Sequence, residues 1–251
     1  MSQAEFQAST PYGAWGMTAA DAPVDVRRTF IRKTYTHLAA AVYAFVALEW
    51  LLFSVGFDQW LLPRLFAFQY SWLLVMLGFV GISWIADSWA RSSTSVGMQY
   101  AGLLLYVAGF SVICVPLLAI AQLYSLNVAG LGTIGVIPAA GWSTLGIFGV
   151  LTAFAFLTKQ DFSFLRGILF VSVIVATALV AFSVFTGFYL GVWFSAAMVL
   201  VACGYILYDT SNVIHHYRSD QHVAASLALF ASVGLLFWYI VRLLMSFANR
   251  D

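Results

Sequence analysis

Residues 165–186 read LRGILFVSVIVATALVAFSVFT, and after Arg166 this stretch contains no charged side chain. It is long enough to cross the hydrocarbon core of a bilayer, which takes roughly 20 residues of helix. Lipid tolerates backbone only in helices or closed barrels, and strands of alternating polarity are absent from the sequence. We therefore predict an all-α polytopic membrane protein with seven transmembrane helices, the other six being at 34–56, 70–88, 98–121, 134–157, 190–208 and 223–245.

The composition agrees with a membrane protein. Hydrophobic residues make up 63% of the 251-residue chain and charged residues 8%, against roughly 25% charged residues in soluble domains. A net charge of +1 gives no sign of a nucleic-acid partner. Cys114 and Cys203 lie in apolar runs and are predicted to be buried thiols, with a disulfide between them as the alternative.

The distribution of basic residues predicts the orientation. Residues 1–25 are small and polar and are predicted to form a flexible tail, which leaves 26–251 as the transmembrane domain. No apolar run precedes Thr34, so no cleavable signal peptide is expected. Most lysines and arginines fall on the side of the amino terminus, which predicts a cytoplasmic amino terminus and an external carboxyl terminus.

Small residues predict where helices approach closely. Gly78 and Gly81 have this role on the second span, and Gly146 and Gly149 on the fourth. The glycines and Pro138 within 130–141 predict an irregular start to the fourth span.

Ionisable groups within spans are functional candidates because their burial in lipid is costly. Arg91 follows Asp87 by four residues, so the two lie on one helix face and can pair. Glu49 and Arg242 lie at similar depths in the first and seventh spans, at 1.5 Å of rise per residue. They are predicted to form an embedded ion pair, or alternatively to extend separately to the outer surface.

Asp209 ends the sixth span. Balanced between desolvation and a nearby Arg91, its carboxylate is suited to a pH-dependent latch; alternatively Asp209 or Ser211 bonds local backbone. The nearby histidines, with Asp220, are interpreted as solvated loop residues rather than a metal site: His215, His216 and His222. No G-x-S-x-G or H-E-x-x-H motif occurs, so no catalytic residues and no enzyme activity are predicted.

Three segments of the sequence carry motifs. Arg32-Lys-Thr-Tyr35 is a basic entry into the first span. Thr158-Lys-Gln-Asp161-Phe-Ser-Phe-Leu-Arg-Gly167 connects into span five, and Ile206-Leu-Tyr-Asp209-Thr-Ser211-Asn212-Val-Ile-His215 ends span six. These three segments resemble the corresponding segments of the bacterial branch of the Bax inhibitor motif proteins, a Bax inhibitor-1-like family.

The resemblance implies a central seventh helix surrounded by six and, in some members, a pH-sensitive calcium leak. Its latch is an acidic pair on spans six and seven near an arginine, which Asp209 and Arg91 match. Ser232 or Val233 takes the place of the second acid. A serine can share a hydrogen bond with Asp209, but it cannot supply the repulsion between two like charges.

Two functions follow as expectations. The first is a calcium or other cation leak channel gated by pH near Asp209, Arg91 and Ser232, with transient Ca²⁺ and no cofactor. The second, which another bacterial member implies, is a non-transporting regulator that binds and modulates a membrane-anchored AAA protease, for which residues 1–25 are a suitable contact. The expected location is the bacterial cytoplasmic (inner) membrane.

Overall fold

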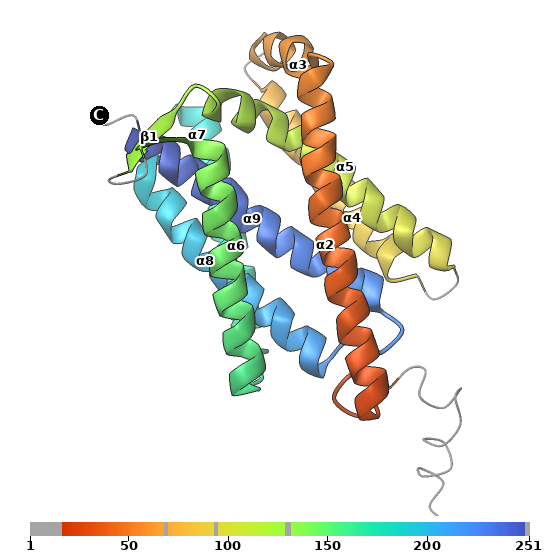
Figure 1. Cartoon of the computed structure of the whole chain (residues 1–251). Coiled ribbons are helices and arrows are strands. Elements are labelled where there is room, and N and C mark those ends of the chain that lie inside the picture. Colours follow the sequence, from red (N-terminus) through yellow and green to blue (C-terminus); the bar gives the residue numbers. More distant parts are fainter. Residues whose placement is uncertain (1–16, 68–69, 93–94, 129–131, 249–251) are drawn as a thin grey trace, which may run out of the picture.

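The computed structural model describes residues 17–67, 70–92, 95–128 and 132–248, and it forms one bundle of helices (Figure 1). Seven helices in these ranges are long and apolar enough to cross a membrane, which confirms the predicted class. They are α2 (Val24–Ser54), α4 (Ser71–Ala90), α5 (Val96–Ala121), α6 (Val136–Thr158), α7 (Leu165–Thr186), α8 (Gly191–His215) and α9 (His222–Ala248). A short helix, α3 (Phe57–Phe66), connects α2 to α4.

A small hairpin precedes the fourth span. Strands β1 (Ser125–Val128) and β2 (Gly132–Gly135) pair antiparallel, with Ser125 opposite Gly135. Helix α6 then begins directly at Val136 and carries Pro138 in its first turn, where a proline costs no helical hydrogen bond. The irregular start expected for this span therefore takes the form of a β-hairpin.

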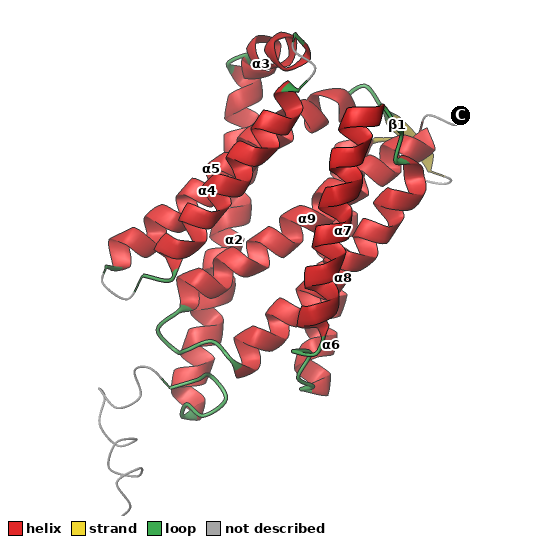
Figure 2. Cartoon of the chain, turned by 180° about the vertical axis from the view of Figure 1, so that it is seen from behind, coloured by secondary structure: helices red, strands yellow, loops and turns green. Residues whose placement is uncertain are grey.

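Helix α9 lies at the centre of the bundle. It packs against α2, α4, α5, α6 and α8, while α7 packs chiefly on α8 at the outside (Figure 2). Leu229, Leu236 and Val241 of α9 are fully buried. A helix that is apolar on nearly all sides must be surrounded by other helices or by lipid. Helix α9 is surrounded by other helices of the bundle.

The amino-terminal segment is partly docked. Thr18 forms a β-bridge with Arg218, and the Ala19 N–H donates to the Tyr217 carbonyl at 2.8 Å. Residues 1–16 of the tail predicted over 1–25 lie outside the described residues. Helix α2 begins at Val24, because the docked turn over residues 18–22 leads straight into it.

The close helix contacts lie at other glycines than those expected. A Cβ on Gly78, Gly81, Gly146 or Gly149 would meet no described atom of a neighbouring helix within 4 Å, so the prediction was wrong for these four glycines. On Gly102 of α5 a Cβ would lie 2.5 Å from the Ala86 carbonyl oxygen and 2.7 Å from the Ala90 nitrogen, both on α4. Gly102 therefore sets the distance between α4 and α5 near the residues of the candidate site.

Candidate functional site

A buried polar contact joins α8 to α9. The Ser232 hydroxyl donates to the Asp209 carboxylate, and both side chains are buried among apolar neighbours such as Ile206 and Leu229. Asp209 remains 8% exposed and Ser232 3%. A buried carboxylate requires a donor, so this serine is its polar partner within the bundle. The hydrogen bond inferred for these two residues is present.

A cavity of about 350 Å³ borders this pair. Asp87 of α4 also lines it, so two carboxylates from different helices face one space. Hydroxyl-bearing side chains complete its polar wall, namely Ser83, Tyr106, Tyr205 and Ser232. Among the described residues that line this largely apolar cavity, the polar side-chain atoms are all oxygens, which are the ligands that hard cations such as Ca²⁺ prefer.

Arg91 is tied to Asp87. Its Nε lies 2.9 Å from both carboxylate oxygens, as the four-residue spacing predicted. Its guanidinium also lies 5.9 Å from the centre of the Tyr217 ring. Burial disfavours the guanidinium charge, but Asp87 and Tyr217 outweigh burial and raise the pKa of Arg91 above its usual value. Arg91 thus stays charged near Asp209 without pairing with it directly.

Tyr217 connects this ion pair to the docked amino-terminal segment. Its carbonyl accepts from Ala19, and burial raises the pKa of its phenol to about 12. The phenol therefore stays neutral beside Arg91 at any physiological pH. Sequence inspection did not single out Tyr217, because only the fold brings the loop after α8 against the end of α4.

The second and third motif segments, residues 158–167 and 206–215, contact each other where the α6–α7 connection meets the end of α8. The fully buried Ser211 hydroxyl accepts from the Phe162 N–H at 2.9 Å and lies 3.4 Å from Asp161 Oδ1. His215 Nδ1 lies 3.0 Å from the Ser211 carbonyl. The Asn212 carbonyl accepts from the Tyr217 N–H at 2.9 Å. These motif residues hold two connections together.

Asp161 is the charged member of this contact. Its Oδ1 accepts from the Ser163 N–H at 2.9 Å, and its Oδ2 lies 3.1 Å from His216 Nε2. The Ser163 N–H and then His216 hold the pKa of Asp161 below its usual value. The carboxylate is therefore ionised throughout the neutral range.

The histidines do not gather in one place. The ring of His222 packs against that of His37 of α2 in a tilted arrangement, with ring centroids 5.0 Å apart, while His216 pairs with Asp161. Asp220 pairs with Arg218 at 2.8 Å. Among the described residues no group of three or more histidine, cysteine, aspartate or glutamate side chains is arranged to hold a metal ion.

The predicted Glu49–Arg242 ion pair is not formed. Both Glu49 carboxylate oxygens are buried without a hydrogen-bond partner. Arg242 instead borders a separate pocket with Tyr124 and Ser195. The two residues lie at similar depths, but their side chains point to different sides of α9, and depth along a helix does not determine that direction.

The fold and these contacts define a seven-helix membrane protein with a carboxylate-lined cavity beside its central helix. The sequence signature of the family described as "Inhibitor of apoptosis-promoting Bax1" matches residues 27–249. The chain therefore belongs to the Bax inhibitor family, as the resemblance indicated.

The similar proteins differ in how much of this chain their similarity covers. Bax inhibitor 1 of Schizosaccharomyces pombe is 39% identical over 46% of this chain and 44% of its own length. A BI1-like protein of Arabidopsis thaliana is 39% identical over 40% of this chain and 41% of its own. The chain therefore matches less than half of the length of these two. The Modulator of FtsH protease YccA of Escherichia coli is 28% identical over 71% of this chain and 76% of its own length.

Proposed function

We propose that this protein is a cation leak channel, most suited to Ca²⁺, whose gate is the contact between Asp209 and Ser232. The observation that carries the proposal is a carboxylate buried at the boundary of α8 and α9 and facing a cavity that a second carboxylate, Asp87, also lines. A carboxylate in such a place changes the local charge by a full unit when it binds a proton. The same group can then attract a cation and sense pH.

Asp87 gives the gate a second carboxylate that does not come from α9. In the ground state Arg91 neutralises it. When a cation enters the cavity, competition for Asp87 would release Arg91 toward Tyr217, which already lies beneath it. Two carboxylates, Asp87 and Asp209, are found among the described residues that line the cavity, and so few favour weak, transient binding over a tight calcium site.

The orientation is part of the proposal. We place the amino terminus and the Arg91 end of the bundle in the cytoplasm, and the protein in a bacterial cytoplasmic membrane, because basic residues concentrate at that end. The gate then lies at the cytoplasmic mouth. No catalytic step is proposed.

Calcium flux into proteoliposomes between pH 6 and pH 8 tests the channel. The native protein is expected to conduct with a pH-dependent rate, and Asp209→Asn to conduct at a rate that pH does not change. Asp161→Asn is the matched control, because it removes a carboxylate at the same end of the bundle that does not line the cavity. Absence of flux at every pH would remove the channel, and a normal pH response in Asp209→Asn would remove Asp209 as the sensor.

A second function rests on the similarity to YccA, whose name describes it as a modulator of FtsH protease. We propose as the alternative that this chain binds a membrane-anchored AAA protease and modulates it without transport. Residues 2–16 precede the docked turn, so their deletion leaves the bridge between Thr18 and Arg218 intact. Co-purification of the protease with the full chain, lost on this deletion, would support the regulator. Retention of the protease would show that the contact lies elsewhere.

A further inference from the structure

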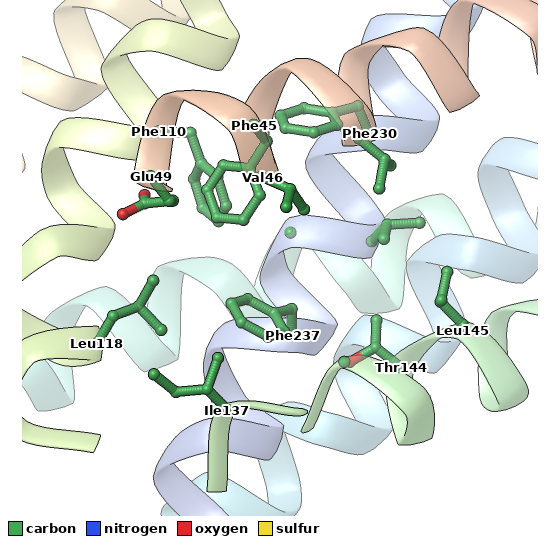
Figure 3. Close-up of a pocket in the computed structure, with 14 residues that line it drawn as sticks. Phe45, Val46, Glu49, Phe110, Leu118, Ile137, Thr144, Leu145, Phe230 and Phe237 are labelled. Atoms are coloured by element: carbon green, nitrogen blue, oxygen red, sulfur yellow. The ribbon is translucent and has the colours of Figure 1, made fainter. Parts of the chain in front are cut away.

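A second cavity lies on the other side of α9. It measures about 240 Å³ and is enclosed by α2, α5, α6 and α9 (Figure 3). It is larger than an engineered apolar cavity of about 150 Å³ that binds benzene. Its wall is almost entirely apolar, and the exceptions are Glu49 on α2 and Thr144 on α6. A small organic molecule therefore fits in it.

Both polar side chains of this cavity lack partners. Glu49 is 7% exposed and Thr144 is 3% exposed. Among the residues that the structure describes, no side chain or backbone group forms a hydrogen bond with the Glu49 carboxylate or with the Thr144 hydroxyl. A buried polar group without a partner costs about 1–3 kcal/mol, and more when it is charged. A ligand that supplies hydrogen-bond donors would remove this cost.

Aromatic rings surround the place where such a ligand would lie. Phe45 is 5.4 Å from Phe110 and 6.0 Å from Phe237, measured between ring centroids. Phe230 meets Phe110 edge-on at 5.9 Å. Figure 3 shows Phe45 and Phe110 beside Glu49. Phenylalanine faces attract cations, and groups of aromatic rings recognise ammonium ligands in other proteins.

The cavity borders the surface that lipid would cover. Val46 of α2 and Leu145 of α6 line it and are 57% and 48% exposed, respectively. These two side chains lie on the apolar flank of the bundle, away from the loops at its ends. A ligand would therefore reach the cavity from the bilayer, which requires a compound that dissolves in the membrane.

We propose that this cavity binds a membrane-soluble amine, with its ammonium group at Glu49 and its apolar body among the phenylalanines. An inorganic cation is disfavoured because Glu49 and Thr144 are the only oxygen-bearing side chains of the lining residues. A neutral apolar molecule would leave the carboxylate without a donor. A primary ammonium can donate hydrogen bonds to both oxygens of the Glu49 carboxylate. The site is separate from the Asp209 cavity and does not depend on the leak function.

Photo-crosslinking of the full chain in maltoside micelles, which contain no amine, tests the proposal. Two probes are compared that share one alkyl chain with a diazirine and end in either a primary amine or an alcohol. The amine is expected to label peptides of α2 and α6 at least about ten-fold more strongly than the alcohol, because a hydrogen bond to a charged group contributes more than a neutral one. Glu49→Gln is expected to reduce amine labelling to the level of the alcohol.

A cavity-filling variant keeps the test decisive if Glu49→Gln fails to fold. Gly141 lines the cavity and a Cβ there would meet nothing within 4 Å, so Gly141→Phe can fill it without moving backbone. Gly146→Phe is the matched control, since Gly146 has the same free space on α6 but does not line the cavity. Labelling should be lost in the first and kept in the second, with helical circular dichroism unchanged.

Two results would overturn the inference. Equal labelling by amine and alcohol in the native protein would identify a neutral occupant instead. Amine labelling that persists in Gly141→Phe would mean that the probe binds outside the cavity.

Discussion

Gly102→Ala is expected to destabilise the protein, although alanine is the better helix former. The added Cβ would lie 2.5 Å and 2.7 Å from the Ala86 oxygen and the Ala90 nitrogen. These are backbone atoms of a helix and cannot rotate away, so α4 and α5 must separate by about 1 Å, which forfeits roughly a quarter to a half of the contact energy of the facing atoms. Overpacking of this kind costs roughly 1–3 kcal/mol, while the helix preference of alanine returns up to about 1 kcal/mol.

Subtracting the return of about 1 kcal/mol leaves a net loss of up to about 2 kcal/mol. For a chain of this size the upper value corresponds to a fall in Tm of roughly 4–8 °C. Thermal unfolding in detergent, followed by helical circular dichroism, measures it. Gly78→Ala on α4 is the matched control: its Cβ would meet no described atom of a neighbouring helix within 4 Å, so its Tm should rise. If Gly102→Ala raises Tm as much as the control does, the close approach of α4 and α5 is refuted.

Three further predictions use the same assay. Ser232→Ala should cost roughly 2 kcal/mol, because it leaves the buried Asp209 carboxylate without its serine donor. Glu49→Met should raise Tm in amine-free detergent, since it removes an unpartnered carboxylate; a lower Tm would contradict this. Asp161→Asn should lower Tm at pH 7 by roughly 1–3 °C. The pKa of Asp161 is lowered in the folded state, so the difference in Tm between the native protein and Asp161→Asn should vanish as the pH falls through that pKa. A difference in Tm that stays constant with pH would contradict this stabilising role of the Asp161 carboxylate.

The spans and the Asp87–Arg91 pair were predictable because both depend on local sequence. Hydropathy over 20 residues identifies a helix in lipid, and a spacing of four identifies a shared face. The bond between Asp209 and Ser232 required the family resemblance, since nothing within the sixth span points to a residue 23 positions away.

The direction in which a side chain points within the bundle was not predictable. Glu49 and Arg242 match in depth, yet the first faces a cavity with Phe110 and the second a pocket with Tyr124. The packing of the glycines was not predictable for the same reason. A glycine allows a second helix to approach closely, but the sequence does not show whether a second helix faces that glycine. The tight positions on α5, Gly102 and Gly109, are seven residues apart, which is a spacing that places both on the face toward α4.

Helix α9 lies between the two cavities, and residues on different faces of this helix line each of them. Phe230, Val233, Gly234 and Phe237 line the cavity of Glu49, whereas Ala228, Ala231, Ser232 and Leu235 line that of Asp209. Each set follows the three- and four-residue spacing of one helix face, and the faces adjoin at Ser232 and Val233. A largely apolar helix can thus carry two distinct surfaces. One of them bonds a carboxylate through a serine, while the other presents only aromatic and aliphatic groups to Glu49. Because both faces belong to one rigid element, a molecule that moves α9 from the Glu49 side also moves the hydroxyl that holds Asp209.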